Sequence, residues 1–205
     1  MSGTERFDQA AATWDGEGRR VKMARAVAEA MVARCGLPAD LDVLDFGCGT
    51  GLVSLALRPL VRSVTGADTS SGMLDVFRTK VREQGLEGVS AVLLPADAPF
   101  AVPGSYDLVV SSMALHHVAD LAPLFAAFRD HLRPGGRVAL ADLDTEDGTF
   151  HEDPAGVVHL GFERATIAAL LRAAGFVDVA VGTATVTRKG DRDYPIFLAT
   201  ARKEG

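Results

Sequence analysis

The chain has 205 residues, of which 48% are hydrophobic and 23% are charged, a composition typical of one globular domain with a substantial core. Its formal net charge is −6, because 27 Asp and Glu outnumber 21 Lys and Arg, and this balance disfavours nucleic acid as a partner. The sequence shows no apolar stretch that could span a bilayer and no apolar signal region in residues 1–6, so we expect a cytoplasmic protein without membrane contact.

Two helical patterns precede the first predicted strand. Residues 7–14 form a short amphipathic segment, and apolar residues then recur at helical spacing from Val21 to Cys35 until Gly36 stops the run. Because the second pattern comes before the first strand, we expect this long helix to pack onto the sheet from outside the first strand–helix–strand unit. Cys35 and Cys48 are the two cysteines, and they form neither a disulfide framework nor a metal-ligand pattern.

The first predicted strand, at 43–46, runs directly into a turn that holds three glycines in five residues, Gly47, Gly49 and Gly51. A helical pattern starts at once from Leu52. This succession opens a nucleotide-binding βαβ unit. Glycine suits such a turn because it adopts unusual backbone angles and has no Cβ to keep a ligand away from the backbone.

Strands and helices alternate along the rest of the chain. Ser70 and Ser71 are suited to cap the helix that follows the second strand. The near-continuous apolar strands predict a parallel sheet covered on both faces, except that the last two are joined by residues 188–191 as an antiparallel hairpin. The polar stretch at 144–159 is typical of a functional or disordered loop. The predicted strands after the first cover residues 61–67, 89–94, 106–111, 137–143, 176–186 and 194–201.

Polar residues lie in or after four successive strands, near the carboxyl edge where open α/β sheets bind ligands. Asp45 lies in the first strand, Asp68 ends the second, Asp97 follows the third, and Ser112 follows the fourth. Asp68 comes about 20 residues after the glycine turn, where a carboxylate can accept both hydroxyls of a ribose. An adenosine-like ligand would meet all four side chains.

The spacing of the glycines separates the classes of nucleotide. A phosphate-binding P-loop needs a Gly-Lys-Ser/Thr ending, which is absent, and a dinucleotide site needs a third glycine where Leu52 stands. Gly51 widens the turn instead, and no basic residue is near it. The pattern therefore favours an adenosyl ligand without phosphates and disfavours an NAD-type oxidoreductase.

At these residues the chain resembles the class I S-adenosylmethionine-dependent methyltransferases. Residues 44–51 look like the first motif of that family, residues 66–74 like the second, and Ala96-Asp97-Ala98 like the third. Residues 7–15 look like the N-terminal segment of the small-molecule subgroup that is related to ubiquinone and menaquinone biosynthesis. The further matching segments are Tyr106-Asp107, Leu115–His117 and Leu132–Gly136.

This resemblance implies a single Rossmann-like, doubly wound domain over residues 1–205, with a mostly parallel seven-stranded sheet and an antiparallel C-terminal strand pair. Residues 1–40 would form N-terminal helices and a lid, 41–143 the cofactor-binding core, and 144–205 a substrate-side loop, a helix and a hairpin. The implied cofactor-binding residues are Asp45, Gly47, Cys48, Gly49, Gly51, Asp68, Thr69, Met73, Ala96, Asp97, Ala98 and Ser112.

The implied reaction is direct in-line transfer of a methyl group from S-adenosylmethionine to a small-molecule acceptor, with S-adenosylhomocysteine as the product. Two alternatives stay open: a non-catalytic domain that binds S-adenosylmethionine as a sensor or partner, and an NAD-type oxidoreductase. The acceptor and the oligomeric state, monomer or homodimer, are open as well.

Five side chains are candidates for roles beyond cofactor binding. His117, after the fourth strand, is the candidate general base, ahead of its neighbour His116. Trp14 is a candidate lid residue, and a core role is its alternative. His151 and His159, in or beside the polar loop, are candidates to face the substrate, although a structural or solvent-facing role is the first expectation for both. We predict no metal site, because these histidines lack the spacing of a helical zinc motif.

Overall fold

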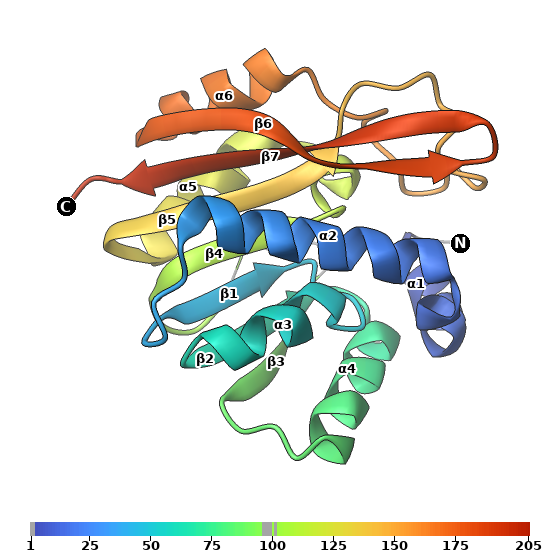
Figure 1. The fold of residues 1–205 in the computed structure, drawn as a ribbon, viewed down its shortest axis with the longest axis horizontal. Coiled ribbons are helices and arrows are strands. Elements are labelled where there is room, and N and C mark those ends of the chain that lie inside the picture. The colour runs from blue at the N-terminus through green and yellow to red at the C-terminus, as the bar shows by residue number, and fades with distance from the viewer. Residues whose placement is uncertain (1–2, 96–99, 101) are drawn as a thin grey trace.

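A computed structural model of the chain describes residues 3–95, 100 and 102–205. Its strands form one sheet of seven in the order β3-β2-β1-β4-β5-β7-β6 (Figure 1). The first five strands in this order pair in parallel, whereas β7 runs antiparallel to both β5 and β6. The expected α/β fold with an antiparallel C-terminal pair is confirmed. The strands are β1 (Asp42–Phe46), β2 (Ser63–Asp68), β3 (Val89–Leu93), β4 (Tyr106–Ser112), β5 (Leu132–Leu143), β6 (Phe176–Lys189) and β7 (Arg192–Lys203).

Helices lie on both faces of this sheet. Helix α2 contacts α3 and the strands β5, β6 and β7, so it packs outside the first strand–helix–strand unit, as expected. Helices α5 and α6 pack together on the opposite face. The helices are α1 (Gly3–Ala10), α2 (Gly18–Cys35), α3 (Leu52–Leu57), α4 (Ser71–Glu83), α5 (Leu121–His131) and α6 (Arg164–Ala173), with short 3₁₀ segments η1 (Ala11–Gly16), η2 (Arg58–Leu60) and η3 (Leu115–His117).

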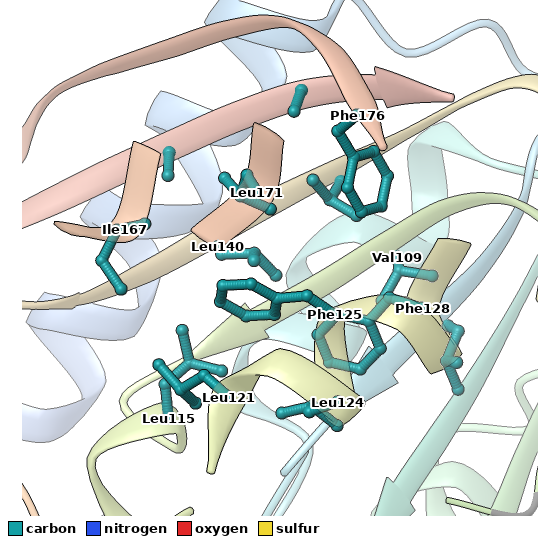
Figure 2. Packing of buried hydrophobic residues seen from close by; sticks show 14 of the residues in the cluster. Val109, Leu115, Leu121, Leu124, Phe125, Phe128, Leu140, Ile167, Leu171 and Phe176 are labelled. Atoms are coloured by element: carbon teal, nitrogen blue, oxygen red, sulfur yellow. The ribbon is translucent and has the colours of Figure 1, made fainter. Parts of the chain in front are cut away.

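The largest part of the core lies between the sheet and helices α5 and α6. Figure 2 shows Phe125 and Phe128 of α5 among side chains of β4, β5 and α6. Both phenylalanines are fully buried, and each such burial stabilises the fold by roughly 2 to 3 kcal/mol. This packing holds β4 and β5 against α5 and α6. The carboxyl ends of these two strands form one side of the candidate site.

Several element ends differ from the sequence-based expectation. Strand β2 begins at Ser63 rather than at residue 61, because its partner β1 begins only at Asp42, opposite Ser63. Strand β5 begins at Leu132, which pairs with Tyr106 before residues 133–136 bulge out of the ladder. Strands β6 and β7 extend to residues 189 and 192, so only two residues form the hairpin turn. The expected cap of α4 is confirmed, since Oγ of Ser70 accepts the N–H of Met73 at 3.1 Å.

The polar loop between β5 and α6 is held in place by the hairpin. The hydroxyl groups of Thr149 and Tyr194 lie 2.7 Å apart, and Nζ of Lys189 donates to the carbonyl of Phe150 at 2.8 Å. In the described part of the chain, no helix is both long and apolar enough to cross a membrane.

Candidate functional site

The glycine turn lies at the carboxyl end of β1, and its three glycines have positive φ angles of 68°, 54° and 81°. A Cβ on Gly47 would lie 2.3 Å from the Cβ of Ala114, and one on Gly51 would lie 2.1 Å from the ring of Phe77. A Cβ on Gly49 would meet nothing within 4 Å. Gly47 and Gly51 are therefore required by packing inside the protein, whereas Gly49 faces open space.

Asp68, the last residue of β2, is bound directly to this turn. One carboxylate oxygen accepts the N–H of Gly49 at 2.7 Å, and the other accepts the N–H of Ser70 at 2.9 Å. Burial raises the pKa of this carboxyl group. Each oxygen can accept a further hydrogen bond, so the open face of Gly49 and the acid beside it suit a ligand that contains a ribose.

Asp45 and Cys48 lie beneath the turn rather than on its surface. Asp45 is 1% exposed and accepts the hydroxyl proton of Ser54 at 2.5 Å. Burial raises the pKa of Asp45 to about 7, and the neighbouring charge of Asp68 adds to this effect. Burial also raises the pKa of the Cys48 thiol well above its ordinary value, so this thiol stays protonated and packs as a small apolar group.

The other proposed cofactor residues occupy varied surroundings. Thr69 is exposed just after β2, Met73 is buried in the first turn of α4, and Ser112 is half-buried as the last residue of β4. Thr69, Ser112 and the glycine turn lie at the carboxyl ends of neighbouring strands, and Met73 lies in the helix that follows β2. The segment Ala96-Asp97-Ala98 lies outside the described residues.

Residues 3–16, the N-terminal segment formed by α1 and η1, are attached to the same corner of the fold. Asp8 accepts the hydroxyl proton of Ser70 at 2.6 Å and the N–H of Gly72 at 2.8 Å. Asp15 accepts the hydroxyl proton of Thr50 at 2.6 Å and pairs with Nζ of Lys80, also at 2.6 Å. Two carboxylates thus fasten the N-terminal segment to the glycine turn and to helix α4.

The same segment reaches the polar loop on the other side of the site. Trp14 is half-buried, packs edge-on against Phe7 at 5.7 Å, and lies under the guanidinium group of Arg20 at 3.8 Å. Phe7 also contacts the ring of His117 at 5.1 Å. Arg6 donates to the carbonyl groups of Asp153 and Ala155 in the loop. The N-terminal segment therefore bridges the cofactor half and the C-terminal half of the domain.

The two adjacent histidines after β4 have different surroundings. His117 is half-buried, and its Nδ1 lies 2.7 Å from the carbonyl oxygen of Gly156. Burial, together with the neighbouring His116, lowers the pKa of His117 to about 4. His116 is 1% exposed, and its Nδ1 lies 2.7 Å from a carboxylate oxygen of Asp142 near the end of β5.

Of the two loop histidines, only His151 lies among these rings. Its ring centroid is 4.8 Å from that of His116, and burial lowers the pKa of His151 to about 4. Within the described residues, Nε2 of His151 is buried and has no hydrogen-bond partner. His159 instead donates from Nε2 to the carbonyl of Val118 at 3.0 Å, which ties the loop to η3.

Sequence reasoning missed three residues that organise the site: Asp8, Asp15 and Asp142. Asp142, near the end of β5, follows the rule that carboxylates gather where parallel strands end, as Asp45 and Asp68 do. Asp8 and Asp15 gave no comparable signal, because their partners lie far away in the chain.

The class of this protein follows from its similarity to known proteins. The family description "Methyltransferase domain" matches residues 44–140, which run from β1 into β5. Aklanonic acid methyltransferase DauC of Streptomyces sp. (strain C5) is 31% identical over 150 residues, which cover 72% of this chain and 67% of that protein. The chain therefore belongs to the class I S-adenosylmethionine-dependent methyltransferases.

Two further relatives match over shorter segments. An uncharacterized methyltransferase of Schizosaccharomyces pombe is 37% identical over 137 residues, which are 59% of this chain and 48% of that protein. Ubiquinone biosynthesis O-methyltransferase of Dinoroseobacter shibae is 34% identical over 110 residues, 54% of this chain and 44% of that protein. The chain thus spans about half the length of these relatives, and such matches support the ubiquinone-related subgroup only weakly.

A solved structure shares the whole fold. One chain in the complex between the Haloferax volcanii Trm112 methyltransferase activator and a methyltransferase has a TM-score of 0.76 to this chain. The superposition covers 97% of this chain and 98% of that chain, at 21% sequence identity. This likeness concerns the fold alone.

Proposed function

We propose that the protein transfers a methyl group from S-adenosylmethionine to a small-molecule acceptor by direct in-line displacement. The observation that carries the proposal is the open face of Gly49 beside the carboxylate of Asp68. S-adenosylmethionine, when bound, supplies an activated methyl group on a sulfonium sulfur and leaves as S-adenosylhomocysteine. The residues proposed to hold it are Asp45, Gly47, Cys48, Gly49, Gly51, Asp68, Thr69, Met73, Ala96, Asp97, Ala98 and Ser112.

In this proposal, residues 1–205 act as one methyltransferase domain and the N-terminal segment is its lid. Trp14 and Phe7 would cover the reacting atoms and exclude water, while Asp8 and Asp15 hold the segment to the cofactor half. Positioning then supplies much of the rate, because a sulfonium methyl is already a good electrophile.

The acceptor would enter between this lid and the polar loop, where it would meet His117 and His151. His159 would act indirectly, by holding the loop to η3. A small molecule is favoured over nucleic acid by the net charge of −6 and by the name of the relative DauC, which acts on aklanonic acid. The subgroup related to ubiquinone and menaquinone biosynthesis remains our proposal for the type of acceptor.

Calorimetry tests the cofactor. We expect S-adenosylhomocysteine to bind and NAD to bind far more weakly; tighter binding of NAD would favour an oxidoreductase instead. Asp68→Ala should weaken S-adenosylhomocysteine binding by at least about tenfold, because it removes a charge-assisted acceptor that contributes on the order of 1.5 to 3 kcal/mol. Glu87→Ala, an exposed change remote from the turn, is the control.

A non-catalytic sensor is the alternative. It shares the cofactor prediction but predicts no transfer of a labelled methyl group to any member of a broad acceptor panel. Transfer to one acceptor, lost when the lid residue pair Phe7 and Trp14 is replaced by alanine, would support the enzyme.

A further inference from the structure

The pair His116 and Asp142 lies at the carboxyl edge of the sheet, where β4 and β5 end. Asp142 is the penultimate residue of β5, and His116 belongs to η3 directly after β4. Both side chains are at most 2% exposed. The loop closes over the pair, because the N–H groups of Val158 and His159 both donate to the carbonyl of His116, at 2.9 and 3.1 Å.

The hydrogen bonds of Asp142 determine the proton positions on His116. The Asp142 side chain accepts the backbone N–H of Leu143 at 2.8 Å and that of His116 at 3.2 Å. A carboxylate surrounded by N–H donors is an acceptor only, so the third contact, at 2.7 Å, requires Nδ1 of His116 to carry its proton. In the neutral ring, Nε2 then holds a free lone pair.

Two further imidazole rings lie beside that of His116. The ring centroids of His117 and His151 lie 4.1 and 4.8 Å from that of His116. Burial keeps both of these neighbours neutral at physiological pH. They form no set suited to hold a metal ion in the described part of the chain. Within the described residues, the buried Nε2 of His151 has no hydrogen-bond partner, and among neutral rings it suits an uncharged polar group of a ligand.

We infer that the acceptor presents a phenolic or enolic hydroxyl, and that Nε2 of His116 removes its proton, with Asp142 as the positioning residue. The inference rests on the proposed function and narrows its acceptor. The O–H bond breaks and its proton passes to Nε2; the O–CH₃ bond forms as the S–CH₃ bond breaks, and the bonding pair stays on sulfur.

The charge balance of this step favours His116 over His117. One positive charge disappears at the sulfonium and one appears on the imidazole that takes the proton. Beside Asp142 the new imidazolium has a buried carboxylate partner, whereas Nδ1 of His117 has only the carbonyl of Gly156. The charged and titratable groups that act on this cluster are Asp142, His117, His151 and, from the N-terminal segment, Arg6.

The first test needs no acceptor. Long-range ¹H–¹⁵N spectra of the wild-type protein resolve the tautomers of its five histidines, and His116→Asn identifies the signals of His116. We expect the Nδ1–H tautomer for neutral His116, with Nε2 unprotonated. An Nε2–H tautomer would overturn the inference, whatever the protein methylates.

The second test uses a panel of phenols and enols, each matched with an aniline, which needs no deprotonation before attack. We expect transfer to a hydroxyl compound, with kcat/KM lowered at least about 100-fold at pH 7 in His116→Asn and in Asp142→Asn. The His116→Asn rate should recover as the pH approaches the pKa of the acceptor hydroxyl, because the phenolate or enolate then present needs no base. A rate that was lost through a structural defect would not recover at high pH.

Matched variants separate the outcomes. His131→Asn, on α5 outside the cluster, is the control and should keep the wild-type profile. If the methyl-transfer rate recovered at high pH in His117→Asn but not in His116→Asn, the base would be His117 and the inference would be overturned. Transfer to anilines alone would overturn it too, while the proposed function stands. If S-adenosylhomocysteine binds and no acceptor is methylated, the proposed function fails, and the tautomer still decides the state of His116.

Discussion

Burial sets the protonation of the groups beneath the glycine turn. Asp45 and Cys48 have almost no exposed surface, and for both the removal of water disfavours the charged form. Burial raises the pKa of Asp68 as well, although hydrogen bonds from three backbone N–H groups act to lower it. The Cys48 thiol beneath the turn is thus uncharged and Asp45 is ionised only in part at pH 7. The carboxyl group of Asp68 lies beside the open face of the turn.

Asp45 should make the unfolding free energy depend on pH. Its pKa rises from an ordinary 3.8 to about 7 in the folded protein, so folding binds a proton between these values, and stability is lost as pH rises through about 7. Asp45→Asn removes this loss. Relative to wild type, the variant should gain roughly 2 to 3 kcal/mol between pH 5 and pH 8, measured by urea unfolding without cofactor. An equal difference at both pH values would contradict the prediction.

The glycines of the turn should respond differently to alanine. Gly49→Ala carries only the strain of a left-handed residue, about 1 kcal/mol, and should fold but bind S-adenosylhomocysteine at least about tenfold more weakly. Gly51→Ala adds a clash with Phe77 and should lose at least about 3 kcal/mol of stability. Thermal unfolding and calorimetry measure both effects. Normal binding by a folded Gly49→Ala would place the ligand elsewhere.

At the scale of elements, the N-terminal segment is held by side chains rather than by a core of its own. Its contacts with the rest of the protein include the hydrogen bonds of Asp8 and Asp15 and those of Arg6 to the polar loop. A cation over Trp14 and the edge contact of Phe7 with His117 add to them. Such contacts are individually worth little, so we expect this element to open more readily than the sheet. That property suits a lid.

Asp8→Ala should release the N-terminal segment selectively. Deuterium uptake in residues 3–16 should speed up at least about fivefold, because the acceptor for Ser70 and Gly72 is lost, while global stability changes by less than about 1 kcal/mol. Asp75→Ala, which removes an exposed carboxylate paired with Arg78 on the same helix, is the control. Equal uptake in wild type and Asp8→Ala would mean that the other contacts of the segment are sufficient to hold it.

Across the whole molecule, the two edges of the sheet have separate tasks. The carboxyl edge bears the open turn and the histidines. The amino edge is joined by ion pairs, in which Arg133 of β5 binds Asp107 of β4 and Asp42 of β1. Arg62 also binds Asp42 and is the main reason that its pKa lies well below the usual range. The amino edge therefore supports the fold.

Arg133→Met should lower the unfolding free energy by about 1 kcal/mol at pH 7 without changing S-adenosylhomocysteine affinity. Because the folded-state pKa of Asp42 is lowered, the loss should shrink as pH falls below the ordinary aspartate value. Arg25→Met, which breaks an exposed pair with Glu29, should change stability by less than about 0.5 kcal/mol. A changed affinity in Arg133→Met would show that the two edges are coupled.

The elements that the sequence predicted well share one property, which is that local pattern determines them. The end of α2 just before Gly36, the turn at Gly47 and the cap at Ser70 follow from periodicity and from the preferences of single residues. The limits of strands were predicted less well, because a strand extends only as far as its partner, as β2 begins at Ser63, opposite the first residue of β1. The roles of the cofactor residues remain predictions.

By itself, the sequence determined the order of strands and helices, the open turn and the acid that follows it, because backbone preferences and hydrophobic period act over a few residues. Only the tertiary structure decided which of two adjacent histidines is oriented by a carboxylate. His116 and Asp142 are 26 positions apart and meet because β4 and β5 pair in register. The same is true of Asp8, whose partners on α4 are more than 60 positions away. Such contacts depend on the packing of the sheet, and no local pattern encodes them.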